Sequence, residues 1–164
     1  MNAPDTKSGL SPLTAIVAGG LAAAILDITY AFIAFAAHAS PVKILQSVAS
    51  GVLGKASYQG GLGSAALGAL LHTAIAIVMA AVYVAATRFL PALTRRPWLW
   101  GPLYGIGCYL VMNYGVLALR FGPRPAPALG VLMGGLAIHM FGVGLPIALI
   151  AARARFAPES SIST

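Results

Sequence analysis

Four long apolar runs constrain this chain more than any other feature of its sequence. A helix needs about 20 consecutive apolar residues to cross the hydrocarbon core of a bilayer. The four runs cover residues 13–37, 62–87, 98–119 and 128–152. We therefore predict an all-α integral membrane protein, in which four transmembrane helices form a bundle within a single transmembrane domain, residues 1–164.

The composition excludes the soluble alternatives. Of the 164 residues, 59% are hydrophobic and 8% are charged, whereas a soluble domain has about 25% charged residues. Cys108 is the single cysteine, which excludes a disulfide framework. The net charge of +7 would suit nucleic acid, but the basic residues lie between the apolar runs rather than on one face. That placement indicates contact with lipid headgroups, so we expect the bilayer as partner and no nucleic acid.

Residues 41–53 have the spacing of a short amphipathic helix. Ser40 is a favourable N-cap, Pro41 a favourable first helical residue and Gly54 a favourable stop. The stretch is too short to span, so we expect an interfacial or re-entrant helix, which either connects two spans or forms a vestibule or gate. Its polar side would carry Lys43, Gln46, Ser47 and Ser50, and its lipid-facing side Ile44, Leu45, Val48 and Val52.

The positions of the basic residues predict the topology. Loops rich in lysine and arginine tend to stay in the cytoplasm. With cytoplasmic N- and C-termini, the inner segments hold Lys7, Arg88, Arg95, Arg96, Arg153 and Arg155, and the outer segments hold Lys43, Lys55, Arg120 and Arg124. This bias favours a multi-pass protein with both termini in the cytoplasm.

The ionisable residues inside the apolar runs lie at one depth. Asp27 is the only acidic residue within or between these runs. Counted along their helices, Asp27, His72 and His139 all lie roughly 15 Å below the outer surface, near the midplane. Asn113 lies about one turn closer to the outside. Each of the three ionisable residues shares a helix face with glycine and alanine, so we expect a buried polar layer that faces neighbouring helices.

Three interpretations of this layer remain open. The first is an interhelical clamp that fixes packing without chemistry. The second is a proton relay or ligand site, since an ionisable residue within the membrane is a functional candidate by default. The third is a cofactor site: His72 and His139 could ligate a haem b iron axially, or bind a metal ion together with Asp27. Because no motif for haem or metal accompanies these residues, we predict no resident cofactor and keep the third interpretation as an alternative.

No enzymatic motif is present. The chain lacks Gly-x-Ser-x-Gly, a Walker loop, a dinucleotide fingerprint and His-Glu-x-x-His. We therefore expect a non-enzymatic small membrane protein with no catalytic residues. It would serve proton or small-solute passage, or act as an accessory subunit of a larger membrane complex. Its protein partners would be copies of itself or the other subunits of such a complex.

The order of segments resembles the YagU-like inner-membrane proteins of bacteria. The likeness rests on "SPVKILQ", then "ALLHTAIAIVMAAVY" followed by "FLP", then a Pro-rich loop and "AIHMFGVGLP". The matched positions are Pro41, His72, Tyr83, Pro91 and His139. The resemblance implies the bacterial inner membrane and this architecture, but no mechanism. Asp27 departs from it, since a basic residue would be expected in the family's first helix.

Overall fold

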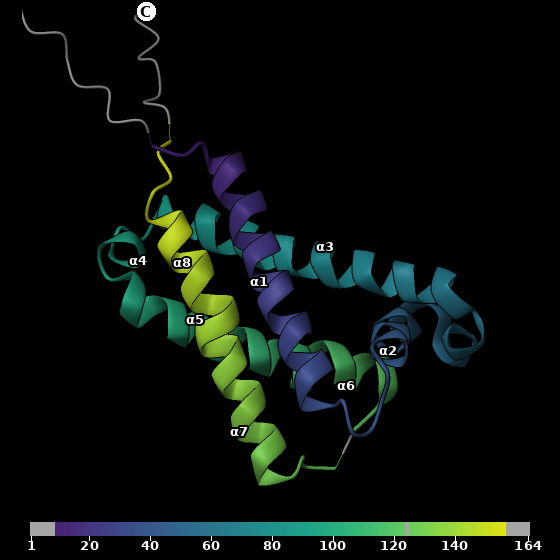
Figure 1. The fold of residues 1–164 in the computed structure, drawn as a ribbon. Helices are drawn as coiled ribbons and strands as arrows, with labels where there is room; N and C mark the ends of the chain where they lie inside the picture. Colours follow the sequence, from purple (N-terminus) through teal and green to yellow (C-terminus); the bar gives the residue numbers. More distant parts are fainter. Residues whose placement is uncertain (1–8, 124, 157–164) are drawn as a thin grey trace, which may run out of the picture.

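Helices make up the regular secondary structure of the described chain. The computed structural model describes residues 9–123 and 125–156. In order, the elements are α1 Pro12–Ala34, α2 Pro41–Leu53, the 3₁₀ helix η1 Gly54–Gln59, α3 Gly61–Thr87, α4 Ala92–Arg95, α5 Pro97–Leu110, the π-helix η2 Val111–Val116, α6 Leu117–Phe121, α7 Leu129–Ile138, the π-helix η3 His139–Gly144 and α8 Leu145–Ala151 (Figure 1).

Four continuous helices are long and apolar enough to cross a membrane. They are Pro12–Ala34, Gly61–Thr87, Pro97–Phe121 and Leu129–Ala151, so that α5, η2 and α6 form the third span and α7, η3 and α8 the fourth. This confirms the predicted all-α membrane bundle. The largest difference from the predicted boundaries is at the end of the first span, which stops at Ala34 rather than at residue 37. The chain turns there, ahead of the cap of α2 at Ser40.

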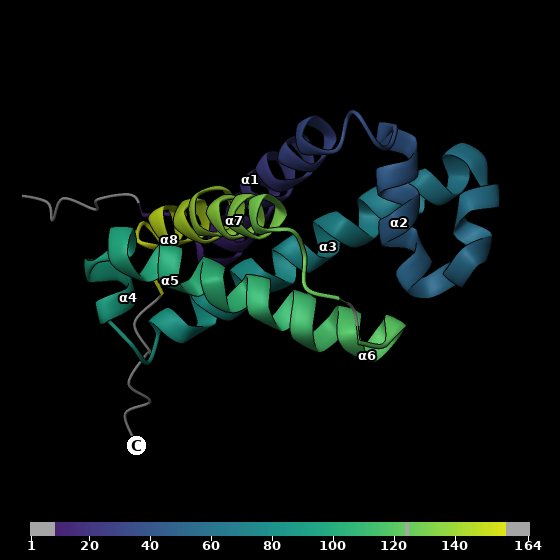
Figure 2. The same cartoon turned by 90° about the horizontal axis from the view of Figure 1, so that it is seen from below.

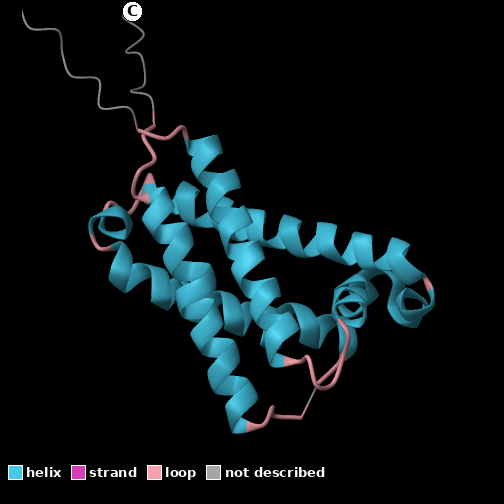
Figure 3. Ribbon diagram, in the orientation of Figure 1, coloured by secondary structure: helices cyan, strands magenta, loops and turns pink. Residues whose placement is uncertain are grey.

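The two ends of the described chain lie side by side. The Leu10 amide donates to the Arg153 carbonyl at 2.9 Å, and the Arg155 amide donates to the Leu10 carbonyl at 3.0 Å. Apart from this isolated bridge, Figure 3 shows only helices and connecting loops over the described residues. Both ends therefore emerge on the same side of the bundle, which we call the terminal end, as an even number of spans requires.

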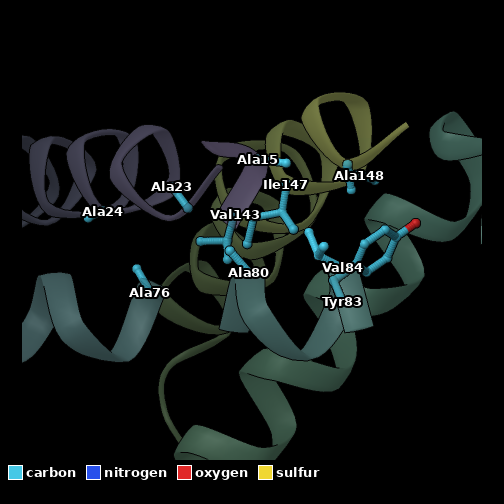
Figure 4. Close-up of a cluster of buried hydrophobic side chains, with 11 residues drawn as sticks. Ala15, Ala23, Ala24, Ala76, Ala80, Tyr83, Val84, Val143, Ile147 and Ala148 are labelled. Atoms are coloured by element: carbon cyan, nitrogen blue, oxygen red, sulfur yellow. The ribbon is translucent and has the colours of Figure 1, made fainter. Parts of the chain in front are cut away.

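A core of small side chains holds the helices together near the terminal end. Alanines of α1, α3 and α8 meet around Tyr83, Val84 and Ile147, each 1% exposed (Figure 4). The Tyr83 ring packs edge-on against Tyr104 of α5, with centroids 5.0 Å apart. The Tyr104 hydroxyl donates to the Met79 carbonyl of α3 at 2.8 Å. These contacts join α3 to α5 at this end and leave a tightly filled interior there.

Glycines bring α5 against the fourth span. A Cβ placed at Gly105 would overlap the carbonyl oxygen of His139, and one placed at Gly144 would overlap the carbonyl oxygen of Gly101. The backbones of the two helices are thus in direct contact. The small-residue spacing Gly101-x-x-x-Gly105 acts here as a packing device, which is its common use in membranes.

The short helix α2 packs against the start of α3. Its first turn is capped by Ser40, whose hydroxyl accepts from the Lys43 amide at 3.4 Å. Gln46 is buried, and its amide nitrogen donates to the Gly61 carbonyl at 3.0 Å and to the Ser64 hydroxyl at 3.3 Å. Part of the predicted polar side of α2 therefore bonds to α3. A buried amide that lacked these partners would be costly, so the bonds fix where α2 docks.

Away from the terminal end, α3 and the third span diverge. Figure 2 shows α3 and α6 separating, with α2 beside the far part of α3. The space between them is lined by side chains of several helices, and it holds the site described next.

Candidate functional site

Asp27 lies between two histidines from different helices. Its Oδ2 atom is 3.8 Å from Nε2 of His72 on α3, and its Oδ1 atom is 3.8 Å from Nδ1 of His139 in η3. The side chain of Asp27 is 22% exposed, and those of His72 and His139 are 18% and 17% exposed. The three residues predicted at equal depth are thus brought together in space.

The backbone fixes which ring nitrogens carry hydrogen. Nε2 of His72 lies 3.1 Å from the carbonyl oxygen of Ala24, and Nδ1 of His139 lies 2.9 Å from that of Gly135. A carbonyl oxygen only accepts, so each of these nitrogens must be an N–H donor. In the neutral rings, Nδ1 of His72 and Nε2 of His139 then remain as acceptors. The same N–H groups also face the Asp27 carboxylate.

Two polar residues of the site, Asn113 and His139, lie in π-helical segments. Asn113 is in η2 and donates from Nδ2 to the Tyr109 carbonyl at 3.0 Å, while His139 is the first residue of η3. The Tyr109 ring packs edge-on against the His139 ring, with centroids 5.3 Å apart. π-helical turns are rare and occur frequently at functional sites. Here both of them lie at the polar layer.

Two cavities meet at this layer. The first, the α2 cavity, has a volume of about 490 Å³ and is lined by α1, α2, α3, η2, α6 and η3. The second, the loop cavity, has a volume of about 900 Å³ and is lined by the first, third and fourth spans and, from the described part of the loop that follows α6, by Pro123 and residues 125–127. Asp27, Asn113 and His139 line both cavities, whereas His72 lines the α2 cavity. The polar layer therefore forms a wall that the two cavities share.

Both cavities extend from the layer away from the terminal end. Their outer linings include exposed residues such as Arg120 and Phe121 in the α2 cavity and Phe35 and Tyr114 in the loop cavity. Toward the terminal end the α2 cavity reaches only Met79 of α3, just before the tightly packed core around Tyr83. The site is thus accessible from one side and closed by packing on the other.

Val48 corrects an expectation about α2. It was predicted to face lipid, but it lines the α2 cavity together with Ser47, Gly51 and Val52. The hydrogen bonds of Gln46 rotate the helix so that its Val48 side points inward. Across the mouth of the cavity, Nε of Arg120 donates to the Gly51 carbonyl at 2.6 Å, which ties α6 to α2.

The arrangement does not fit a metal held by Asp27 and both histidines. Among the described residues, no group of three or more His, Cys, Asp or Glu side chains is placed to hold a metal ion. The ring nitrogens that face Asp27 are N–H donors to backbone carbonyls and offer no lone pair to a metal. The haem alternative, which needs only the two histidines, stays a prediction.

Sequence reasoning missed the aromatic and basic residues of the site. Tyr30 and Tyr109 line the loop cavity beside Asp27, and Arg120 lines the α2 cavity. A local signal existed for the tyrosines, since Tyr30 is three residues after Asp27 and Tyr109 four residues before Asn113, and such spacings share a helix face. No local signal could pair Arg120 with Gly51, which is 69 residues away.

The comparisons with protein-family models, curated proteins and solved structures gave no match to this chain. The resemblance in segment order to the YagU-like proteins therefore remains a prediction. The membrane-protein class rests on the four apolar helices of the chain itself. The functional argument rests on the geometry of Asp27, His72 and His139 and on the two cavities.

Proposed function

We propose that this chain is a non-enzymatic membrane protein that passes protons or a small solute through the bilayer. The observation that carries the proposal is the position of Asp27, which contacts both His72 and His139 and lines both cavities. A lone carboxylate near the bilayer midplane is expensive, and it is tolerated where it faces a bundle interior or a water-filled cavity that serves transport.

The chemistry of the layer supports proton transfer. A neutral imidazole can accept a proton at its free nitrogen, Nδ1 of His72, while it releases the proton of Nε2 toward the Asp27 carboxylate. The distance of 3.8 Å is too long for a direct hydrogen bond, so one bridging water or a small movement completes the path.

Complete passage requires the terminal end to open. There the path is closed by the contacts of Tyr83, Tyr104 and Met79 between α3 and α5. We infer that this structure corresponds to the state in which the layer is accessible from the side of α2 and α6. Rearrangement of α3 against α5 would expose the layer to the other side, as in alternating access around a fixed midplane site.

Replacing Asp27 tests the proposal directly. In liposomes that contain the purified protein and an internal pH-sensitive dye, a membrane potential should drive proton entry. We expect Asp27→Asn to reduce this flux by at least about tenfold, because an amide does not take up and release a proton as a carboxylate does. His38→Gln, which changes the exposed histidine after α1, should keep the wild-type flux.

The opposite results would favour the interhelical clamp. If wild-type liposomes show no flux above that of empty ones, or if Asp27→Asn conducts as well as wild type, the layer is structural. The chain would then be better interpreted as an accessory subunit of a membrane complex.

We further propose the bacterial inner membrane as its location, with both termini in the cytoplasm. The bias of basic residues toward the terminal end supports this orientation, as does the resemblance to the YagU-like proteins. Arg88 and Arg95 lie beside the terminal end, whereas Lys43, Lys55 and Arg120 lie at the other end. Lys7 and Arg124, which entered the predicted bias, lie outside the described residues.

Cysteine labelling in intact cells measures the orientation. In a Cys108→Ala background, Gln59→Cys should react with a membrane-impermeant maleimide added outside the cells, because Gln59 is exposed in η1. Arg95→Cys, exposed on the terminal side, should react only after the cells are opened. Labelling of residue 95 but not of residue 59 in intact cells would reverse the proposed topology.

A further inference from the structure

We propose that the loop cavity binds an organic ammonium ion, so that the solute handled at the polar layer is an amine or a quaternary ammonium compound with an apolar body. This inference rests on the proposed function and names its substrate class. It is carried by the charge, the aromatic lining and the size of the cavity.

The charge of the site favours a cation. Asp27 is the only acidic residue in the described chain, and its side chain lines the loop cavity. His139 shares this wall and, in its neutral form, presents an acceptor nitrogen, because its Nδ1–H is directed to the Gly135 carbonyl. A half-buried carboxylate is stabilised by a positive ligand.

The aromatic lining suits the same charge. Tyr30 and Phe35 come from the α1 side, and Tyr109 and Tyr114 come from α5 and η2. The faces of aromatic rings attract cations, and cages of aromatic residues commonly recognise quaternary ammonium groups. The four aromatic residues line the cavity from the first span and the turn after it and from the third span.

Two adjacent glycines make room for these rings. A Cβ at Gly134 would overlap the Tyr30 hydroxyl, and a Cβ at Gly135 would lie 2.8 Å from the Tyr109 ring. The Gly134-Gly135 pair thus allows tyrosines from α1 and α5 to lie against α7. With larger residues at positions 134 and 135, the two tyrosine rings would have to move away from these positions.

The volume of the loop cavity and the charge at the α2 cavity are consistent with an organic ammonium ion in the loop cavity. A volume of about 900 Å³ is within the range of cavities that take drug-sized ligands. The α2 cavity, by contrast, has the Arg120 guanidinium at its mouth, which repels cations. A positive ligand that reaches Asp27 would therefore occupy the loop cavity.

Binding of phenyltrimethylammonium tests the inference. This ion has no removable proton, so its charge is constant, and tert-butylbenzene has nearly the same shape without the charge. With the full chain in phosphatidylcholine nanodiscs, calorimetric titration should show saturable binding of the ion and at least about tenfold weaker binding of the neutral analogue.

Variants assign the site. Asp27→Asn should weaken binding of the ion by at least about tenfold, and Tyr114→Leu by about threefold, as expected for the loss of a charge and of one exposed ring. Tyr114→Phe should retain most of the affinity, since the ring face remains. Tyr58→Leu, at an exposed tyrosine outside both cavities, is the matched control and should bind as wild type does.

Several outcomes would overturn the inference. These are the absence of saturable binding, equal binding of the neutral analogue, and unchanged affinity in both Asp27→Asn and Tyr114→Leu. The Tyr114 variants keep the test decisive if Asp27→Asn fails to fold. Proton flux is measured without any amine, so flux without binding would refute only the substrate class, whereas binding without flux would refute only proton passage.

Discussion

Gly105→Ala is expected to lower the free energy of unfolding by about 3 kcal/mol, at the upper end of overpacking substitutions. The new Cβ would overlap the His139 carbonyl oxygen and lie 2.6 Å from its carbonyl carbon and 2.8 Å from the Met140 Cα atom. All three atoms belong to the backbone, so no side-chain rotation relieves the overlap. The third span must move away from η3, which would also displace His139 from Asp27.

Thermal unfolding in detergent measures this effect, and the same helix offers a control. Gly107 has no atom within 4 Å of a Cβ placed on it. Gly107→Ala should therefore leave the protein as stable as wild type or slightly more stable, because alanine favours helix by about 1 kcal/mol over glycine. Equal losses in the two variants would show that the direct contact of α5 with η3 is not important for stability.

Removing a histidine partner of Asp27 is expected to destabilise the protein, and neutralising Asp27 is expected to recover part of the loss. His72→Ala or His139→Ala leaves the carboxylate less well satisfied in a low-dielectric interior, at a cost of roughly 1–3 kcal/mol. Adding Asp27→Asn should restore some stability, since an amide is cheaper to bury than a charge. A double-mutant cycle isolates the coupling, which should be about 1 kcal/mol.

The geometry makes this cycle specific. Because Asp27 is 3.8 Å from each ring, coupling should appear with His72 and with His139 alike. The exposed His38 provides the control, and its replacement by alanine should be additive with Asp27→Asn. Additivity with all three histidines would mean that proximity at the polar layer carries no energy and that Asp27 is stabilised by solvent in the cavities instead.

Local sequence patterns were sufficient to predict the four spans and α2. Whether a segment spans a membrane depends on the length and apolarity of that segment alone, so the four runs predicted the spans. The cap at Ser40 and the proline at position 41 likewise predicted the start of α2, which begins at Pro41. Counting residues at 1.5 Å each was enough to expect Asp27, His72 and His139 at one level.

The tertiary structure alone decided what surrounds that level. Asn113 and His139 lie in the π-helical segments η2 and η3, whose hydrogen bonds span five residues rather than four, and no local pattern marks such turns. The inward rotation of Val48 depends on bonds from Gln46 to the start of α3.

The cavities and the hydrogen positions on the histidines also depend on the tertiary structure. Tautomers are set by the carbonyls of Ala24 and Gly135, and the Ala24 carbonyl lies on a different helix from His72. The α2 cavity lies where α3 and the third span diverge beyond their contact at Tyr104. The sequence thus determined which segments are long and apolar enough to span a membrane and which of their residues share a level, because hydrophobic length is a local property. Only the packing of one helix against another decided which of them meet, because crossing geometry depends on contacts between residues far apart in the chain.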